Sequence, residues 1–391
     1  MYTIKNFKSG NRNMITDYFL KLGVISKRAM TLLPKTSYRN FIRKLSDMKH
    51  EGLVEEIIAS DKSKVMRLRD YLSINKVSGD KDGLTTKDII AEGFSEDELS
   101  AYENGVYQTA SRITSISAQK AHRFVAESDT KAFMMASNLA INDFDANKVF
   151  IESRKIKGMN YEGDDVGEED GKKKVSFSKT NGVIISPGGN YVAYRLLTNK
   201  VSRLSVGEYK IINHTRDVLK KVRKQKPENN FELSSGLLLT NSLDYFTSAL
   251  APADFDDINS VRFNNFLNLY AEVFVLPYSK DGVELMKIML MKDWRIKLKL
   301  FATNNQYDGN EDKGSIYDVR SGNDFILAFC VPDVIRLKKF ADTAKMSTDK
   351  SRKYYVACFN FQADFVKSVA GESVTVVTAT INDFLNLKED K

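Results

Sequence analysis

The sequence predicts a protein of mixed class, α+β in its first part and α/β in its larger second part. Two observations predict this class. Helical apolar spacing and one hairpin pattern fill the first 69 residues, and strand-like runs alternate with helical runs from residue 271 onward. The hydrophobic fraction of 42% and the aromatic fraction of 10% are ordinary for a globular protein, and 391 residues are enough for two or three domains.

The first two helices are predicted from apolar spacing and from a cap. The first covers residues 14–22, where one helical face collects Ile15, Tyr18, Phe19 and Leu22. Ser26 is placed to cap a second, short helix, which runs through Leu33 and stops at Pro34.

A third helix is predicted from Thr36 or Ser37 to about His50, with Gly52 as its C-terminal cap. Its apolar stripe consists of Tyr38, Phe41, Ile42, Leu45 and Met48. Its opposite face carries Arg39, Asn40, Arg43, Ser46, Asp47 and His50, with Lys44 to one side. Side chains of these types are suited to base edges and phosphates.

A β-hairpin is predicted after the third helix. The segments LVEEII and VMRLRDYLSI lie on either side of the turn at residues 60–64, which carries two lysines. Three helices followed by a hairpin make up a winged helix-turn-helix. We therefore expect a winged helix at the N-terminus of the chain.

The charge of this segment favours DNA as its partner. Residues 1–69 hold 15 Lys or Arg against 6 Asp or Glu, a balance of +9, whereas the whole chain carries +8. The remainder is therefore about neutral, and a basic unit on a neutral body locates the expected DNA surface. The candidate DNA-binding residues are Arg28, Lys35, Arg39, Asn40, Arg43, Lys44, Lys62 and Lys64.

Each of these residues has an expected role. In the third helix, Arg39 and Arg43 would contact bases or phosphates, and Asn40 would read adenine. Lys62 and Lys64 would contact the backbone or the minor groove from the hairpin. The alternative interpretation is a solvated helix face with no partner, or a winged helix that binds protein.

Two changes of composition divide the rest of the chain. Acidic residues gather between 78 and 100, so the first boundary is expected near residue 78. Residues 158–174 are acidic and glycine-rich, then basic, and are expected to form a mobile loop. The predicted domains are a winged helix at 1–77, a helical connector at 78–147 and a mixed α/β domain at 148–391.

The α/β domain is predicted from its strand and helix runs. Strand-like runs lie at 149–153, 182–186 and 191–196, and Pro187-Gly188 suits a type II turn between the last two. Further strands are expected at 271–276, 325–330, 354–359 and 374–378, with helices at 280–291, 333–344 and 362–369 between them. This alternation predicts a mixed, partly parallel sheet covered by helices.

The sequence lacks the motifs of several kinds of catalytic and cofactor-binding site. The three histidines are scattered, without a His-x-His metal motif, and two cysteines cannot build a zinc site of the finger type. No Gly-x-x-x-x-Gly-Lys-Ser/Thr loop for ATP occurs. We therefore expect no catalytic residue, no metal site and no cofactor.

Two carboxylate patterns run counter to this expectation. Residues 308–312 imitate the opening of a calcium loop, but Lys313 replaces the required Gly and Val319 the required Glu. Glu208-Tyr209-Lys210 has the Glu-x-Lys form of metal-dependent nucleases, without an upstream Asp at the end of a strand, and Glu152-Ser153-Arg154 is a weaker variant. A nuclease therefore remains the second alternative.

The sequence lacks the signals of membrane insertion and export. No apolar run reaches about 18 residues, and no signal-peptide pattern follows Met1. Cys330 and Cys358 are the only cysteines, each in an apolar strand-like run. We expect a cytoplasmic protein without a membrane partner.

These segments together resemble the replication-relaxation family of proteins carried by plasmids and integrative elements of Gram-positive bacteria. The resemblance lies in ITDYFLKLGVISKRAMTLL and YRNFIRKLSDMKHEGLV with the hairpin, and in FIESRKIKG, GVIISPGGNYVAYRL and VFVLPYSKDGVELMKIML. It spans most of the chain, and its motifs are loose. It implies DNA binding in the replication, transfer or maintenance of a mobile element, and it transfers no catalytic residue.

The expected function is therefore recognition of a double-stranded DNA site in a plasmid, conjugative element or phage, without catalysis. The α/β domain would form a homodimer or recruit a replication or transfer protein. The main alternative is a winged-helix transcriptional regulator whose C-terminal domain senses a ligand or dimerises.

Overall fold

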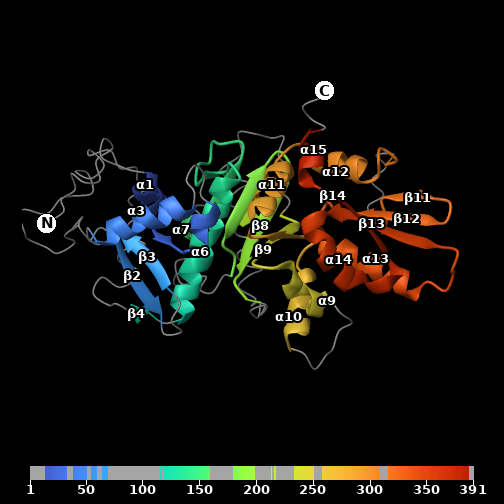
Figure 1. The fold of residues 1–391 in the computed structure, drawn as a ribbon, viewed down its shortest axis with the longest axis horizontal. Helices are drawn as coiled ribbons and strands as arrows, with labels where there is room; N and C mark the ends of the chain where they lie inside the picture. The colour runs from blue at the N-terminus through green and yellow to red at the C-terminus, as the bar shows by residue number, and fades with distance from the viewer. Residues whose placement is uncertain are drawn as a thin grey trace, which may run out of the picture. The chain divides into compact units, whose positions relative to one another are not determined.

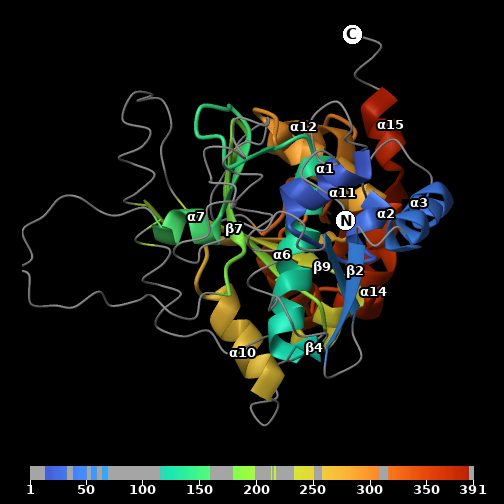
Figure 2. The same ribbon diagram turned by 90° about the vertical axis from the view of Figure 1, so that its left-hand side faces the viewer.

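The structure is a computed structural model of mixed α/β class, and it forms two compact units, residues 1–136 and 137–391. It describes residues 14–32, 38–50, 54–59, 64–68, 115–116, 118–158, 179–198, 213, 215–216, 233–250, 258–307 and 316–386. Figure 1 shows the described helices and strands from blue to red along the chain, and Figure 2 shows them from the side.

Unit 1 combines helices with a small sheet. Its helices are α1 (Met14–Leu22), α2 (Ala29–Leu32), α3 (Tyr38–His50) and α6 (Ala118–Ala136). Its strands are β1 (Val24–Ile25), β2 (Val54–Ala59), β3 (Lys64–Leu68) and β4 (Ser115–Ile116), in the order β1-β3-β2-β4. β2 and β3 form the expected antiparallel hairpin, β1 pairs with β3 antiparallel, and β4 pairs with β2 parallel.

The core of unit 1 forms where the predicted apolar faces meet. Ile15 and Phe19 of α1 pack in one cluster with Phe41 and Leu45 of α3 and with Met66 of β3. α6 packs against α1, α2 and the sheet, although the sequence analysis placed residues 118–136 in a connector. The helical spacing of apolar residues therefore predicted the buried faces of α1 and α3. The packing of α6 against α1, α2 and the sheet was not predicted from the sequence.

A single hydroxyl joins two parts of unit 1. Ser26 is buried, and its Oγ accepts a hydrogen bond from the backbone N–H of Ala29 at 2.9 Å, as expected of the cap of α2. The same hydroxyl donates to Oδ1 of Asp129, a fully buried carboxylate of α6, at 2.5 Å. The start of α2 and the position of α6 thus depend on the same side chain.

Unit 2 contains two sheets. The first has the order β10-β9-β8-β7-β6-β5, with bounds β5 (Ala140–Ile141), β6 (Val149–Glu152), β7 (Gly182–Ser186), β8 (Gly189–Leu196), β9 (Ser235–Thr240) and β10 (Glu272–Pro277). The second has the order β11-β12-β13-β14, with bounds β11 (Val319–Ser321), β12 (Asp324–Ala328), β13 (Lys353–Phe359) and β14 (Thr375–Ala379). β8, β9 and β10 run parallel, and so do β12, β13 and β14.

Helices cover these sheets. They are α7 (Ser153–Gly158), α9 (Thr247–Leu250), α10 (Ile258–Leu267), α11 (Lys280–Met289), α12 (Trp294–Ala302), α13 (Val334–Met346), α14 (Ala363–Ala370) and α15 (Ile381–Asn386), with a 3-10 helix at Leu243–Phe246. One apolar core serves both sheets. The sheets meet where the backbone N–H of Val275 in β10 donates to the carbonyl of Pro332, at 3.1 Å.

The turn between β7 and β8 differs from the expected geometry. A type II turn needs a positive φ at Gly188, but the positive φ, 138°, is at Gly189, so that expectation was wrong. Position 188 packs closely against α11 and has room only for glycine, because a Cβ there would lie 1.9 Å from the carbonyl oxygen of Met289. The Gly188 carbonyl also accepts hydrogen bonds from Nε1 of Trp294 at 2.8 Å and from the hydroxyl of Tyr191 at 3.0 Å.

Replacing Ser26 by Ala should destabilise unit 1 by about 1–2 kcal/mol, because the cap of α2 and the hydrogen bond to Asp129 are lost together. Native-state hydrogen exchange on the whole chain measures this through the amides of α2 and α3. Tryptophan fluorescence would not serve, since the single tryptophan, Trp294, lies in unit 2.

The matched control is Ser46→Ala, which removes an exposed hydroxyl of α3. Equal protection of the amides of α2 and α3 from exchange in the two variants would show that the Ser26 hydroxyl does not stabilise unit 1.

Candidate nucleic-acid interface

α3 presents two chemically different faces. Phe41, Leu45 and Met48 are buried, at 2–4% exposure, and Ile42 is half-buried. The spacing of these apolar residues leaves one side of the helix with nothing to bury. The interior of unit 1 therefore determines which side chains of α3 face the solvent.

The exposed face of α3 carries the residues expected from the sequence. It comprises Arg39, Asn40, Arg43, Lys44, Ser46, Asp47 and His50. Within the part of the chain that the structure describes, no carboxylate pairs with Arg39, Arg43 or Lys44. The only ion pair of α3 there is Lys49–Glu56, at 2.7 Å, which ties the helix to β2. Three cations thus stay available to a partner.

The other predicted DNA-binding residues have separate positions. Arg28 is exposed directly before α2. Lys64 is the first residue of β3, but its side chain lies outside the described residues, as do Lys35 and Lys62 entirely. The structure therefore brings Arg39, Asn40, Arg43 and Lys44 together on one helix and leaves the contribution of the hairpin tip a prediction.

The described residues show no group suited to hold a metal ion: none contains three or more His, Cys, Asp or Glu in reach of one another. Glu152, at the end of β6, is held by Asn142, which donates from Nδ2 to its carboxylate at 2.8 Å. Glu208-Tyr209-Lys210 and the carboxylates at 308–312 lie outside the described residues.

The two cysteines are buried thiols. Burial raises the pKa of Cys330 well above its ordinary value and that of Cys358 to about 12. A thiol with a raised pKa holds its proton at neutral pH and is a poor nucleophile. These side chains therefore act as small apolar residues of the core.

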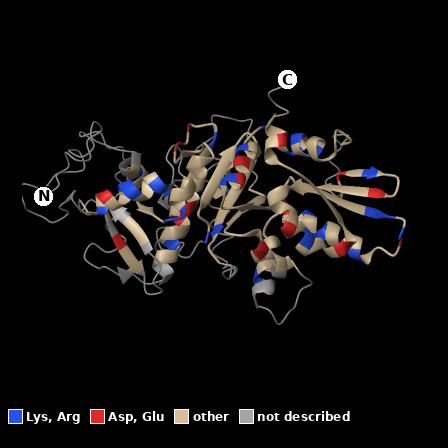
Figure 3. Cartoon of the chain, in the orientation of Figure 1, with Lys and Arg blue, Asp and Glu red and all other residues tan. Residues whose placement is uncertain are grey.

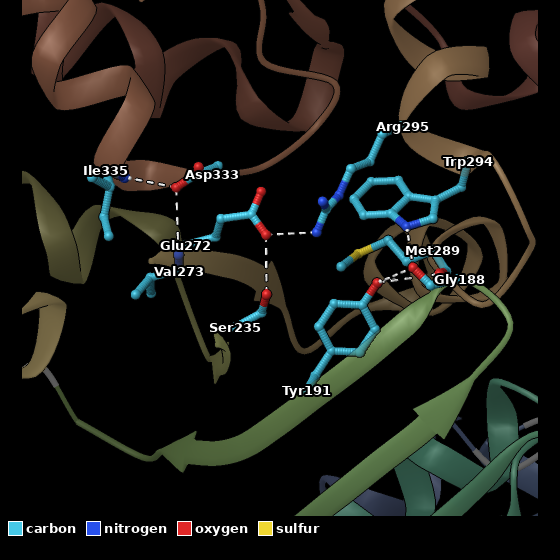
Figure 4. A network of polar contacts seen from close by, with 10 residues as sticks. All are labelled: Gly188, Tyr191, Ser235, Glu272, Val273, Met289, Trp294, Arg295, Asp333 and Ile335. Atoms are coloured by element: carbon cyan, nitrogen blue, oxygen red, sulfur yellow. Dashed lines mark hydrogen bonds and ion pairs between the residues drawn. The ribbon is translucent and has the colours of Figure 1, made fainter. Parts of the chain in front are cut away.

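A partly buried polar network in unit 2 joins β9, β10 and the helices around them (Figure 4). Glu272 accepts hydrogen bonds from Oγ of Ser235 at 3.0 Å and from Nη2 of Arg295 at 2.6 Å. Asp333, 3% exposed, accepts from the backbone N–H groups of Ile335 at 3.0 Å and Val273 at 3.4 Å. The network holds α12 and the start of α13 to the edge of the first sheet, so its evident role is structural.

The pKa of Asp333 is raised from 3.8 to about 6. Burial is the main cause, the negative charge of Glu272 adds to it, and the two backbone N–H groups and Arg336 oppose it. Neither the network nor this shift was predicted from the sequence, which indicated only that Asp333 begins a helix.

Exposed cations also gather in unit 2, at a place that the sequence analysis missed. Residues 336–353 hold seven Lys or Arg against two Asp, and this local count was the signal that could have revealed them. Figure 3 shows blue positions on α13, on the β11–β12 hairpin and at the loop before β13.

The chain was compared with known proteins. No protein-family model matches it, and neither a curated protein nor a solved structure does. Among the described helices, none has the length and apolar character needed to cross a membrane.

The raised pKa of Asp333 predicts a pH-dependent stability of unit 2. Between pH 3.8 and about 6 the folded state binds the proton more tightly than the unfolded state, so this group's contribution to stability falls as pH rises through that window. Above pH 6 the buried charge costs about 2–3 kcal/mol. Asp333→Asn keeps an oxygen to cap α13 and removes the charge, so we expect it to be more stable than the wild type at pH 8 and similar to it at pH 4.

Urea denaturation followed by fluorescence of Trp294 measures this difference, because Trp294 lies in unit 2. Asp281→Asn, which changes an exposed carboxylate in the first turn of α11, is the control. The same stability difference at pH 4 and pH 8 for Asp333→Asn would contradict the assignment.

Proposed function

We propose that unit 1 is a winged helix that binds double-stranded DNA at a specific site. The observation that carries this proposal is the exposed face of α3, where Arg39, Asn40, Arg43 and Lys44 lie opposite a buried apolar face. Within the described residues, the three cations have no carboxylate partner. Charged groups of this kind attract phosphates, and Arg and Asn can make paired hydrogen bonds to guanine and adenine.

In this proposal α3 lies in the major groove. The N-terminal part of a recognition helix contacts base edges, which assigns base contacts to Arg39, Asn40 and Arg43. Lys44, to one side of that face, contacts phosphates, and so does Arg28 before α2. The β2–β3 hairpin is the wing, with Lys62 and Lys64 as its expected contacts to the backbone or the minor groove.

The process served is proposed from the family resemblance described above. The protein would act in the replication, transfer or maintenance of a plasmid, conjugative element or phage, in the cytoplasm and without catalysis or cofactor. Unit 2 would form a homodimer or bind a replication or transfer protein. A transcriptional regulator with the same DNA-binding unit remains the alternative.

Fluorescence anisotropy on labelled duplexes tiled across the protein's own encoding locus tests this proposal, with a scrambled duplex as control. A salt-sensitive preference for one tile supports site recognition. A tile beside an origin or transfer site favours the mobile-element function, and a tile beside a promoter favours the regulator. Equal binding to all tiles, or none, contradicts the proposal.

Replacing Arg43 by Ala should weaken binding to the preferred tile by about 1–3 kcal/mol and reduce the preference over the scrambled duplex, because a base contact is lost. Anisotropy titrations on both duplexes measure the two affinities. The control is Arg123→Ala, which removes an exposed arginine of α6 in the same unit. If Arg43→Ala binds both duplexes as the wild type does, α3 is not the recognition helix.

A further inference from the structure

One end of unit 2 carries a group of exposed cations, which we name the basic end. It is formed by the β11–β12 hairpin, the last turn of α13 and the loop that leads into β13. It is defined by Arg320, Lys345, Lys350, Arg352 and Lys353, all of them exposed; Nζ of Lys345 donates to the carbonyl of Val369 at 2.7 Å, whereas the other four belong to the hairpin and the loop. The described carboxylates within this segment are Asp324 and Asp349.

The basic end is held together by short polar contacts. In the loop, Asp349 accepts hydrogen bonds from the backbone N–H of Ser351 at 3.0 Å and from its Oγ at 2.7 Å. In the hairpin turn, Asn323 donates from Nδ2 to Oγ of Ser351 at 3.0 Å and accepts from the backbone N–H of Lys353 at 3.0 Å. Loop and hairpin therefore present their charges as one surface.

Two arginines are anchored on an aromatic ring. The guanidinium carbons of Arg320 and Arg352 lie 5.4 Å and 5.9 Å from the ring centroid of Phe325. Phe325 is itself buried and stacks on Tyr354 with centroids 5.3 Å apart. Arg352 also forms an exposed ion pair with Asp349 at 3.2 Å, and such pairs contribute little and are readily exchanged.

The lysines are more available than the arginines. Among the described residues, no carboxylate pairs with Lys350 or Lys353. Exposed hydroxyl and amide groups of Ser321, Asn323 and Thr348 lie in the same segments. Lys and Arg accompanied by Ser, Thr and Asn are the side chains that contact the phosphates of nucleic acids.

The chemistry of the basic end fits a duplex better than other anionic partners. Phe325 and Tyr354 are buried, and Tyr317, edge-on to Phe325 at 5.1 Å between centroids, and Tyr355 are half-buried, so the described residues of the basic end offer no fully exposed ring on which single-stranded bases could stack. A protein partner would call for a buried apolar anchor, and the only large apolar side chain described as strongly exposed here is Met346. A phosphate backbone needs only the cations and the neutral donors.

We propose that the basic end binds the phosphate backbone of duplex DNA without sequence preference, adding to the contacts made by unit 1. This inference rests on the proposed function only for the identity of the ligand. Unit 1 would select the site, and the basic end would raise the affinity for any duplex long enough to reach it.

The test is the double variant Lys350→Gln/Lys353→Gln, which leaves the two ring-anchored arginines in place. The matched control is Lys292→Gln/Lys297→Gln, which removes the same charge from two exposed lysines before and within α12. Both are titrated by anisotropy against the preferred and the scrambled 40-base-pair duplexes at several salt concentrations. Far-UV circular dichroism and Trp294 fluorescence check that both variants are folded.

We expect the slope of log K against log salt concentration to become shallower by about one to two in the double variant, since about 0.9 is lost per phosphate contact. Affinity at 0.1 M salt should fall about tenfold or more for both duplexes, and the ratio between them should stay unchanged. The control should keep the wild-type slope.

The two proposals fail in distinguishable ways. If Arg43→Ala reduces sequence preference while the double variant keeps the slope of its control, the site-recognition proposal stands and the basic end is not a DNA contact. If the double variant loses binding to anionic vesicles or to an acidic peptide but not to DNA, its partner belongs to another class and the inference is wrong. If the wild-type chain binds no duplex, both proposals fail.

Discussion

The burial of one face of α3 is the constraint on which the proposed DNA surface depends. A helix can direct only one side into the core of a small unit, and Phe41, Leu45 and Met48 occupy that side. Arg39 and Arg43 are then exposed by geometry alone, whatever their function. Their position is therefore a firm result, and the proposal adds the partner. Asp47 lies on the same face, but among the described residues no ion pair joins a carboxylate to Arg39, Arg43 or Lys44, and this supports the proposal that they bind a partner.

The polar groups buried in unit 2 have a different role from those of α3. Glu272 pairs with Arg295 and Ser235, and Asp333 binds backbone N–H groups at the point where the two sheets meet. Glu272 and Arg295 are half-buried, whereas Asp333 is buried, and a buried charge is costly unless it is paired or hydrogen-bonded. The raised pKa of Asp333 follows from its burial and from the negative charge of Glu272, and its hydrogen-bond partners are the backbone N–H groups of Val273 and Ile335.

Local patterns predicted the elements of this fold better than their arrangement. The strand expected at 271–276 is β10, at Glu272–Pro277, and the helix expected at 333–344 is α13, at Val334–Met346. Apolar spacing and caps act within a few residues, so one sequence is enough to read them. The pairing of β10 with β9, the packing of α6 on α2 and the contacts of Gly188 join residues far apart in the chain, and no local pattern encodes them. The turn between β7 and β8 was also assigned the wrong type, since its positive φ is at Gly189 and not at Gly188.

Charge was read from the sequence at too coarse a scale. The balance of +9 in residues 1–69 against +8 for the chain makes the remainder about neutral, yet residues 336–353 hold seven Lys or Arg and two Asp. The neutral sum arises because acidic stretches such as 78–100 and 158–174 enter the same count. Screening at physiological salt limits each exposed charge to a range of about 8 Å, so a bound phosphate responds to the nearest side chains and not to the sum over a domain. Counting charges over short stretches, such as residues 336–353, reveals the excess of cations that the sum over the whole domain conceals.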